Sequence, residues 1–390
     1  MKKIKFSKQL TEALSISLDK ELPFALYITP GQTEPHFIAA RNIEFVGGEQ
    51  LGKDNDWHGF VLNLFHPQDK LPIGIPAELT AEDIVSQKDK IAYQGSRSFY
   101  APYESTSPAL YMAQVNKFVA ALKSTGTPLK KAVLCRMVSA FGRPVIDVAQ
   151  EYFSEFPNTF RYLYCTPLTG VWIGASPELL IDCDFEANRV STMSLAGTQR
   201  IGSDGDWSSK NVNEHNIVTE YIVSALKYLG LEPEVSEIYE RQFGEVVHLC
   251  NDISAPYNGV DLAKLLNTLS PTPALCGWPK REAMQLIENT EAFDRLCYGG
   301  WIGTKDAKGL HTFVNLRCAV AVDTIVGPIH YCVFTGGGIM PDSNYREEWE
   351  ETANKAIRLC SIISLPDDTQ PVDELTDFSL TINPEFSNRK

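Results

Sequence analysis

The alternation of apolar and polar positions divides the chain into short apolar segments and a few longer amphipathic ones. Two short apolar runs, 24–29 (FALYIT) and 59–65 (GFVLNLF), lack helical periodicity and lie among turns rich in Pro and Gly, so they predict strands. Residues 158–176 predict two strands around a turn at Thr169-Gly170, and 189–200 predict another strand that enters a glycine turn.

Apolar residues recur at helical spacing along 214–230, which predicts an amphipathic helix that ends at Gly230. Further helices are expected at the ranges 262–269, 280–293 and from about Asn344 to Ile363. Between the last two, 310–323 and 329–338 predict adjacent buried strands. Because strands and helices are mixed without a regular alternation, the pattern favours an α+β fold over a doubly wound sheet.

The composition places the chain among globular proteins. It has 390 residues, 44% of them hydrophobic and 22% charged, which is enough apolar material for a large core. The net charge of −14 disfavours nucleic acid and anionic membranes as partners. No apolar run approaches the ~20 residues of a membrane span, and the N-terminal residues lack the apolar core of a signal peptide. The nine scattered cysteines, without a CxxC pair, indicate reduced thiols, so we expect a cytoplasmic protein.

Four glutamates lie close together in the last predicted helix, at 347, 348, 350 and 351. Helical spacing places Glu348, Glu351 and Lys355 on one face, with Glu347 and Glu350 to the side. One interpretation is a solvated first turn in which acids complement the helix dipole. The other is that some carboxylates point inward at a metal, next to the Gly336–Gly338 triplet, whose backbone can approach an anion closely.

Other polar residues lie in apolar surroundings and allow the same two kinds of interpretation. Glu214, in the first turn of its predicted helix, is either a dipole-complementing acid or a ligand of a hard cation such as Mg²⁺. Lys131 begins a buried strand and is either an edge lysine or a base. Glu178 follows a Ser-Pro turn and is either a turn acid or a protonated, donating carboxyl. Arg317 lies in a predicted strand, where a buried guanidinium requires an anionic partner.

Taken in order along the chain, several segments resemble the chorismate-utilising enzymes. The segments are KAVLCR, GASPELL, SLAGTQR, NEHNIV, SPTPALCGWPKREA, FDRLCYGGWIG, NLRCA, TGGGI and EEWEETANK, and they lie within residues 95–363. The resemblance implies one α+β domain with two stacked antiparallel sheets and helices outside. It further implies that 1–94 is a divergent N-terminal part of the same fold and that 364–390 is an acidic C-terminal extension.

Three positions distinguish among the members of this family. Amine-using members carry Gln where this chain has Lys131, aminodeoxychorismate synthases carry a nucleophilic Lys where it has Ala196, and anthranilate synthases read PAGT where it has PTPA at 271–274. All three positions are similar to those of isochorismate synthases. The implied reaction is the isomerisation of chorismate to isochorismate, which menaquinone, siderophore and salicylate pathways use.

The resemblance also assigns roles to individual residues. It implies that Lys131 is the base that activates water and Glu178 the acid, with Mg²⁺ as the cofactor held by Glu214, Glu351 and Glu348. The implied substrate-binding residues are Ala196, Gly197, Thr198, Thr272, Arg317, Gly336, Gly337, Gly338 and Lys355. A salicylate synthase that releases pyruvate from the same site is the alternative, and a non-catalytic chorismate-binding protein is a more remote one. We expect no glutaminase subunit, because Lys131 argues against amination. We also expect a monomer, because no exposed apolar heptad indicates obligate assembly.

Overall fold

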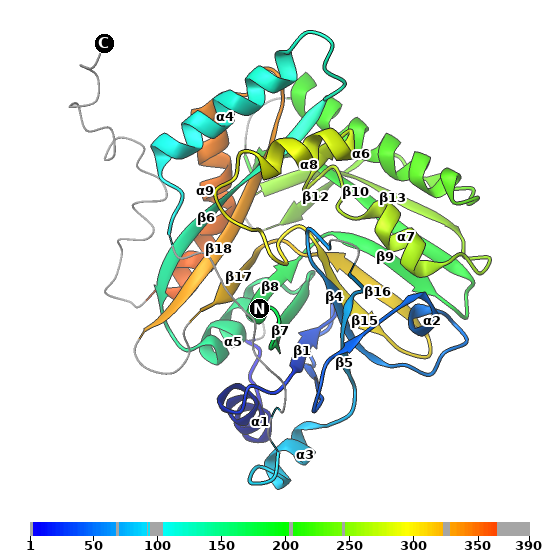
Figure 1. Cartoon of the computed structure of the whole chain (residues 1–390), viewed down its shortest axis with the longest axis vertical. Coiled ribbons are helices and arrows are strands. Elements are labelled where there is room, and N and C mark those ends of the chain that lie inside the picture. Colours follow the sequence, from blue (N-terminus) through cyan, green and yellow to red (C-terminus); the bar gives the residue numbers. More distant parts are fainter. Residues whose placement is uncertain are drawn as a thin grey trace.

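The computed structural model of the chain describes residues 3–67, 70–91, 93, 104–202, 206–243, 246–322 and 328–364 (Figure 1). In this described part, the strands form one eight-stranded and one ten-stranded sheet, and every strand pairing within them is antiparallel. The predicted α+β architecture is thereby confirmed. None of the helices in these ranges has the apolar length that crossing a bilayer requires.

The elements have the following bounds. The helices are α1 (Lys8–Asp19), α2 (Gly48–Leu51), α3 (Ala81–Ser86), α4 (Pro108–Lys123), α5 (Val145–Glu155), α6 (Ser209–Tyr228), α7 (Leu262–Leu269), α8 (Lys280–Glu288) and α9 (Tyr345–Ile363). The eight-stranded sheet has the order β14 (Gly277–Trp278), β6 (Lys131–Gly142), β18 (Ile329–Ile339), β17 (Cys318–Ala321), β8 (Gly170–Ser176), β7 (Phe160–Thr166), β1 (Phe24–Ile28) and β2 (His36–Ala39). The ten-stranded sheet has the order β11 (Glu234–Val235), β13 (Val246–Pro256), β10 (Arg189–Arg200), β9 (Leu179–Asp184), β16 (Gly309–Val314), β15 (Trp301–Lys305), β4 (Gly59–Asn63), β5 (Ile73–Pro76) and β3 (Glu44–Phe45), with β12 (Tyr239–Phe243) also paired to β13.

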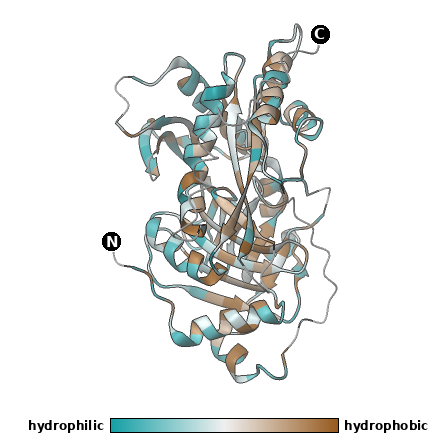
Figure 2. Cartoon of the chain, turned by 90° about the vertical axis from the view of Figure 1, so that its left-hand side faces the viewer, coloured by the Kyte–Doolittle hydropathy of each residue, from teal (hydrophilic) through white to brown (hydrophobic). Residues whose placement is uncertain are grey.

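The two sheets pack face to face through aromatic side chains. Phe160 on β7 stacks on Phe313 on β16 with ring centroids 4.5 Å apart, and Phe60 on β4 lies 6.4 Å from Phe160. All three rings are buried in one hydrophobic cluster that draws residues from both sheets. Burial of large aromatic rings is a strong stabilising contribution, so this layer holds the sheets together. In Figure 2, hydrophobic residues accordingly gather along the strands in the middle of the molecule.

Helices cover the outer faces of the sheets. Helices α5 and α9 share a hydrophobic cluster with the outer face of the eight-stranded sheet, whereas α6 and α7 lie against β10 and β9 of the other sheet (Figure 1). The C-terminus of α9 meets the end of β6, where Arg143 N–H donates to Ile363 O at 3.0 Å. A Cβ at Gly142 would lie only 1.8 Å from that carbonyl oxygen, so this close approach requires glycine.

Three details of the predicted elements were wrong. The predicted strand 310–323 is two strands, β16 and β17, that belong to different sheets, and Arg317 lies in the crossing between them with φ of +53°. The helix predicted at 214–230 starts earlier because Ser208 caps it by accepting from Asn211 N–H. Glu214 is therefore in the second turn, not the first. The helix predicted at 280–293 is shorter, since α8 ends at Glu288. The strand predicted at 189–200 is β10, which leads into a turn at Ile201-Gly202 as expected.

The N-terminal residues contribute strands to both sheets, since β1 and β2 join the first and β4 and β5 the second. The division of the chain at residues 94 and 363 stays a prediction. The predicted C-terminal extension, 364–390, lies outside the described residues except for Ser364, whose N–H donates to Cys360 O at the end of α9.

Candidate active site

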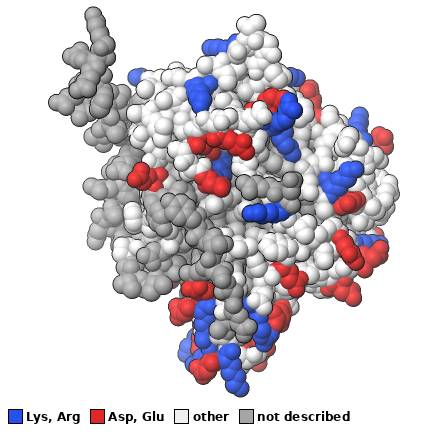
Figure 3. All heavy atoms as spheres, viewed as in Figure 1, with Lys and Arg blue, Asp and Glu red and all other residues white. Residues whose placement is uncertain are grey.

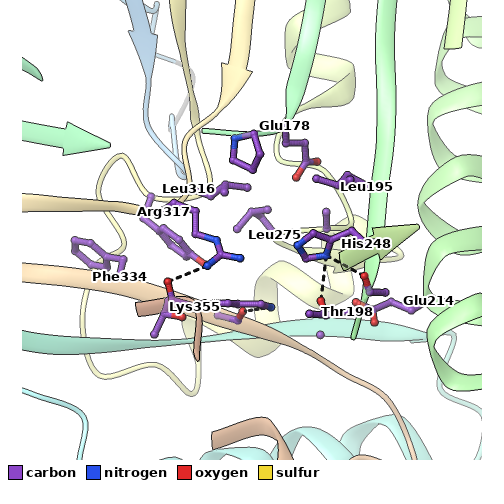
Figure 4. A pocket seen from close by; sticks show the side chains of 18 residues that line it. Glu178, Leu195, Thr198, Glu214, His248, Leu275, Leu316, Arg317, Phe334 and Lys355 are labelled. Atoms are coloured by element: carbon purple, nitrogen blue, oxygen red, sulfur yellow. Dashed lines mark hydrogen bonds between the residues drawn. The ribbon is translucent and has the colours of Figure 1, made fainter. Parts of the chain in front are cut away.

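A cavity with about 650 Å³ of empty space, its open mouth included, lies where residues of both sheets meet (Figure 4). The predicted site residues that line it are Glu178, Ala196, Gly197, Thr198, Glu214, Arg317, Gly336, Gly338 and Lys355. These residues come from distant parts of the chain, so the fold brings together most of the site that the sequence proposes.

Lys131 lies directly behind this lining. Its Nζ is 2.8 Å from Glu214 Oε1, its side chain is fully buried, and it has no hydrogen-bond partner of ordinary geometry among the described residues. Gly338 on β18 lies against this pair. A Cβ at this position would lie 2.3 Å from Glu214 Oε1 and 2.8 Å from Lys131 Cε. The Gly338 position thus provides the space in which the two side chains meet.

Glu178 occupies a different wall of the cavity, well away from Glu214 in Figure 4. It lies in the turn between β8 and β9, and its backbone carbonyl accepts a hydrogen bond from Val314 N–H at 2.9 Å. Its side chain is 3% exposed, and burial raises the pKa of its carboxyl to about 8, against a smaller lowering by Lys131. At neutral pH the carboxyl is therefore mostly protonated and can donate.

Arg317 and Lys355 form a cationic wall. Arg317 Nη1 donates to Lys355 O at 2.9 Å, and Tyr152 Oη donates to Arg317 O at 3.0 Å, which fixes the crossing between β16 and β17. Lys355 Nζ in turn donates to Gly336 O at 3.0 Å. Contrary to the expectation for a buried guanidinium, no ion pair between Arg317 and a carboxylate occurs among the described residues, so its charge remains available to an anionic ligand.

The bulge in β10 shapes another wall of the cavity. Gly197 has φ of +72°, and the register with β13 shifts between Ala196 and Thr198. The buried His248 on β13 faces this bulge, with Nδ1 2.9 Å from Gly197 O and 3.3 Å from Thr198 Oγ1. Burial, then the charges of Arg317 and Lys355, lower the pKa of His248 to about 3. The imidazole is therefore neutral at physiological pH.

Five predicted site residues do not line the cavity: Lys131, Thr272, Gly337, Glu348 and Glu351. The hydroxyl of Thr272 is buried without a hydrogen-bond partner in the described part of the chain, although Ala274 and Leu275 nearby do line the cavity. Gly337 faces α9 instead, because β18 alternates its residues between the two faces of the sheet. A Cβ at Gly337 would lie 3.0 Å from Glu348 Oε2 and 3.9 Å from Glu351 Oε1.

The glutamates of α9 divide between the interior and the surface. Glu348 is 1% exposed, whereas Glu347 and Glu350 are exposed, which is the division that the helical spacing predicts. Burial, then the neighbouring charge of Glu351, raise the pKa of Glu348. Burial also raises that of Glu351, but Lys355, 2.6 Å away, lowers it overall. The charge of Glu351 acts on Glu348, so a cation near both carboxylates would be stabilised.

Each of the three expected metal ligands is now paired with a lysine. Glu214 pairs with Lys131, Glu351 with Lys355, and Glu348 with Lys210, whose Nζ lies 2.7 Å from Glu348 Oε1. No group of three His, Cys, Asp or Glu side chains forms a ready ligand set among the described residues. The carboxylates nevertheless fit a hard divalent cation in their chemistry, and Glu348 Oε2 is buried without a hydrogen-bond partner within the same residues.

A buried guanidinium holds α9 against the sheet. Arg136 on β6 donates from Nε to Thr352 Oγ1 at 2.8 Å and from Nη2 to Trp349 O at 3.3 Å. Its guanidinium carbon lies 3.6 Å from the ring centroid of Trp349. These contacts are on the outer face of β6, opposite Lys131, so one strand positions both the proposed base and the helix that carries Glu348 and Glu351.

Sequence reasoning missed His248, Tyr298 and Lys210. His248 and Tyr298 line the cavity, and Lys210 contacts Glu348. His248 lies among apolar residues of a buried strand, so the local sequence does not indicate that its imidazole contacts the bulge of β10. For Lys210 the signal was present, since it precedes Glu214 by four residues and therefore lies on the same helical face.

Comparison with known proteins identifies the family. A model of a family described as "Chorismate binding enzyme" matches residues 45–364, which is most of the chain. The chain belongs to this family of chorismate-binding enzymes. Relatives include the isochorismate synthase EntC of Escherichia coli K12, 31% identical over 258 residues that cover 62% of this chain and 64% of that protein. The vibriobactin-specific isochorismate synthase of Vibrio cholerae is 30% identical over 58% of this chain and 60% of its own length. The chain thus matches less than two thirds of the length of these two curated family members.

Two solved structures have the same fold as this chain. The putative 2,3-dihydroxybenzoate-specific isochorismate synthase DhbC of Bacillus anthracis aligns with a TM-score of 0.70 at 20% identity, covering 90% of this chain and 99% of that one. The menaquinone-specific isochorismate synthase MenF of Escherichia coli has the same TM-score and identity, with 92% of each chain covered. At this identity the likeness concerns the fold.

Proposed function

We propose that this protein is an isochorismate synthase, which isomerises chorismate to isochorismate with Mg²⁺ as its cofactor. The observation that carries the proposal is Glu178, a protonated carboxyl that faces the cavity on a different wall from the Lys131–Glu214 pair. An acid and a base on separate walls are what this exchange of hydroxyl positions requires. The names of the relatives and the Lys131, Ala196 and PTPA positions support the same reaction.

The reaction moves a hydroxyl from C4 of the ring to C2. Lys131, acting as a neutral amine, takes a proton from water while the water oxygen bonds to C2, and the ring double bonds shift. The C4–O bond then breaks, and Glu178 gives its proton to the departing hydroxyl, which leaves as water. The lysine must release its proton and the carboxyl must regain one before the next turnover.

The cationic wall of Arg317 and Lys355 and the glycines of β18 bind the substrate carboxylates. Arg317 and Lys355 supply charged donors, while Ala196, Gly197, Thr198 and Thr272 shape the cavity around the ring. Gly336–Gly338 let the substrate approach β18 closely. The neutral His248 supports the bulge through its contact with Gly197 O.

Glu214, Glu351 and Glu348 would hold the metal. When bound, Mg²⁺ would supply Lewis-acid stabilisation of charge on the ring carboxylate. Glu348 and Glu351, which now contact Lys210 and Lys355, would have to release these lysines to hold it. We further propose that the protein acts as a cytoplasmic monomer, without a glutaminase subunit.

The test is a product assay. Purified protein is incubated with chorismate and Mg²⁺, or with chorismate and EDTA, and the products are separated by chromatography. Isochorismate in reversible equilibrium with chorismate, lost with EDTA, is the expected result. Stoichiometric salicylate and pyruvate would make the protein a salicylate synthase instead. No product with Mg²⁺ would overturn the enzymatic proposal and favour a non-catalytic chorismate-binding protein.

A further inference from the structure

A second cavity adjoins the active site. It has about 810 Å³ of empty space, its open mouth included, and lies between α5, α9 and the ends of β8 and β13. Pro177, Arg317 and Lys355 line both cavities, so the two spaces meet at the cationic wall. Arg317 and Lys355 therefore lie between the second cavity and the active site.

Three cationic side chains line the second cavity. At the mouth, Arg358 on α9 has a side chain that is 50% exposed. Lys355, three residues earlier and hence on the same helical face, is 17% exposed. Arg317 also lines both cavities. The exposure of the two α9 cations thus decreases along the path toward the active site.

The other side chains that line the second cavity are mostly aromatic or apolar and can pack against the ring of a substrate. Tyr152, Phe156 and Phe243 line the second cavity together with apolar residues of α9. One carboxylate, Glu155, also lines it, and Glu155 Oε1 lies 2.6 Å from Arg358 Nη2. The pair is 35% and 50% exposed, so solvent screens it and a competing carboxylate can replace Glu155 at low energetic cost.

The charge of the whole chain disfavours the approach of an anionic substrate. A net charge of −14 repels a dianion at long range. On the face shown in Figure 3, acidic and basic side chains are interspersed, so attraction of an anion there depends on local groups. The second cavity carries three cations and one carboxylate, the opposite balance to the chain as a whole.

We propose that the second cavity is the entrance through which the dianionic substrate reaches the active site, and that Arg358 is its first binding contact. A carboxylate of the substrate replaces Glu155 on Arg358 and then passes to Lys355 and Arg317. The inference rests on the proposed function for the identity of the dianion. Arg358 acts on association and has no part in the chemical steps.

The test compares charge-altering variants in stopped-flow measurements of chorismate association, followed by tryptophan fluorescence with Mg²⁺ present. Arg358→Gln should lower the association rate constant about 3- to 10-fold at low ionic strength, and the loss should vanish in ~0.5 M salt. Turnover at saturating chorismate should not change. Arg281→Gln is the matched control, because it removes the same charge from an 83% exposed site that lines neither cavity.

Glu155→Gln separates the entrance role from a structural one. It breaks the same ion pair as Arg358→Gln but leaves the cation, so it should raise the association rate. A fall like that of Arg358→Gln would mean that the ion pair only stabilises α9, and would overturn the proposal. Equal rates for Arg358→Gln and Arg281→Gln would overturn it as well. Failure of the proposed function would show separately, as absence of isochorismate from the wild-type protein.

Discussion

Lys131 Nζ and Glu214 Oε1 meet 2.8 Å apart in a space that exists because residue 338 has no side chain. The contact joins the first residue of β6 to the second turn of α6, across the strand β18. It places the proposed base beside a proposed metal ligand, so the glycine is as necessary to the site as the two charged residues.

Gly338→Ala should therefore inactivate the protein. The added Cβ would lie 2.3 Å from Glu214 Oε1 and 2.8 Å from Lys131 Cε, so the pair must separate. We expect turnover to fall by about 10²-fold or more, because misplacing a proton-transfer group by ~1 Å costs that much. Gly52→Ala is the control, since its Cβ would meet nothing closer than 3.4 Å. Wild-type turnover in Gly338→Ala would contradict the role given to this pair.

The pKa of Glu178 predicts how activity depends on pH. Because burial raises that pKa to about 8, the donating, protonated form is present below this pH and lost above it. The turnover rate should fall as pH rises through about 8. Glu178→Gln should reduce turnover by about 10²- to 10⁴-fold, the usual contribution of a general acid. A rate that stays level through this range in the wild-type protein would argue against Glu178 as the acid.

Burial of the Glu178 carboxyl also makes the stability of the folded protein depend on pH. Its pKa in the folded protein lies above the usual value of 4.5, so unfolding releases a proton and the free energy of unfolding falls as pH rises between 4.5 and about 8. Glu178→Gln removes this penalty. The variant should melt at a higher temperature than the wild-type protein at about pH 9, with little difference at about pH 4. Equal melting temperatures at both pH values would contradict the burial of an ionisable carboxyl.

The metal site predicts different effects for neighbouring glutamates. Glu351→Ala should raise the Mg²⁺ concentration needed for half-maximal activity, and should weaken Mn²⁺ binding measured by electron paramagnetic resonance. Glu350→Ala, on the exposed face of the same helix, should change neither. The two variants remove the same charge from α9, so a difference between them reports position. Equal metal titrations would return Glu351 to the role of a structural partner for Lys355.

The sequence predicted most of the strands and helices that carry the site and the two faces of α9. It did not predict helices α1 to α5, or how segments cross between layers. Asn344 accepts a hydrogen bond from Arg346 N–H at the start of α9, and the helix ends at Ile363 as expected, because capping and periodicity are local signals. Residues 310–323 are apolar on both sides of Arg317, so nothing local indicates that the chain changes sheets there. The lysine partners of the three glutamates likewise depend on tertiary contacts.

Arg136 gives a final prediction, about a residue that touches neither cavity. Arg136→Lys keeps the charge but loses the flat guanidinium that stacks on Trp349 and the Nε–H bond to Thr352 Oγ1. Since these contacts set the position of Glu348 and Glu351, metal affinity should fall about 10-fold, as for other groups that orient ligands from behind.

Variants of Thr352 test the same contact from the other side. Thr352→Ser keeps the hydroxyl that accepts from Arg136 and should bind Mn²⁺ like the wild-type protein, whereas Thr352→Val should resemble Arg136→Lys. Melting temperatures identify any variant that has lost its fold. Wild-type Mn²⁺ affinity in both Arg136→Lys and Thr352→Val would mean that the packing of α9 positions the glutamates without this guanidinium.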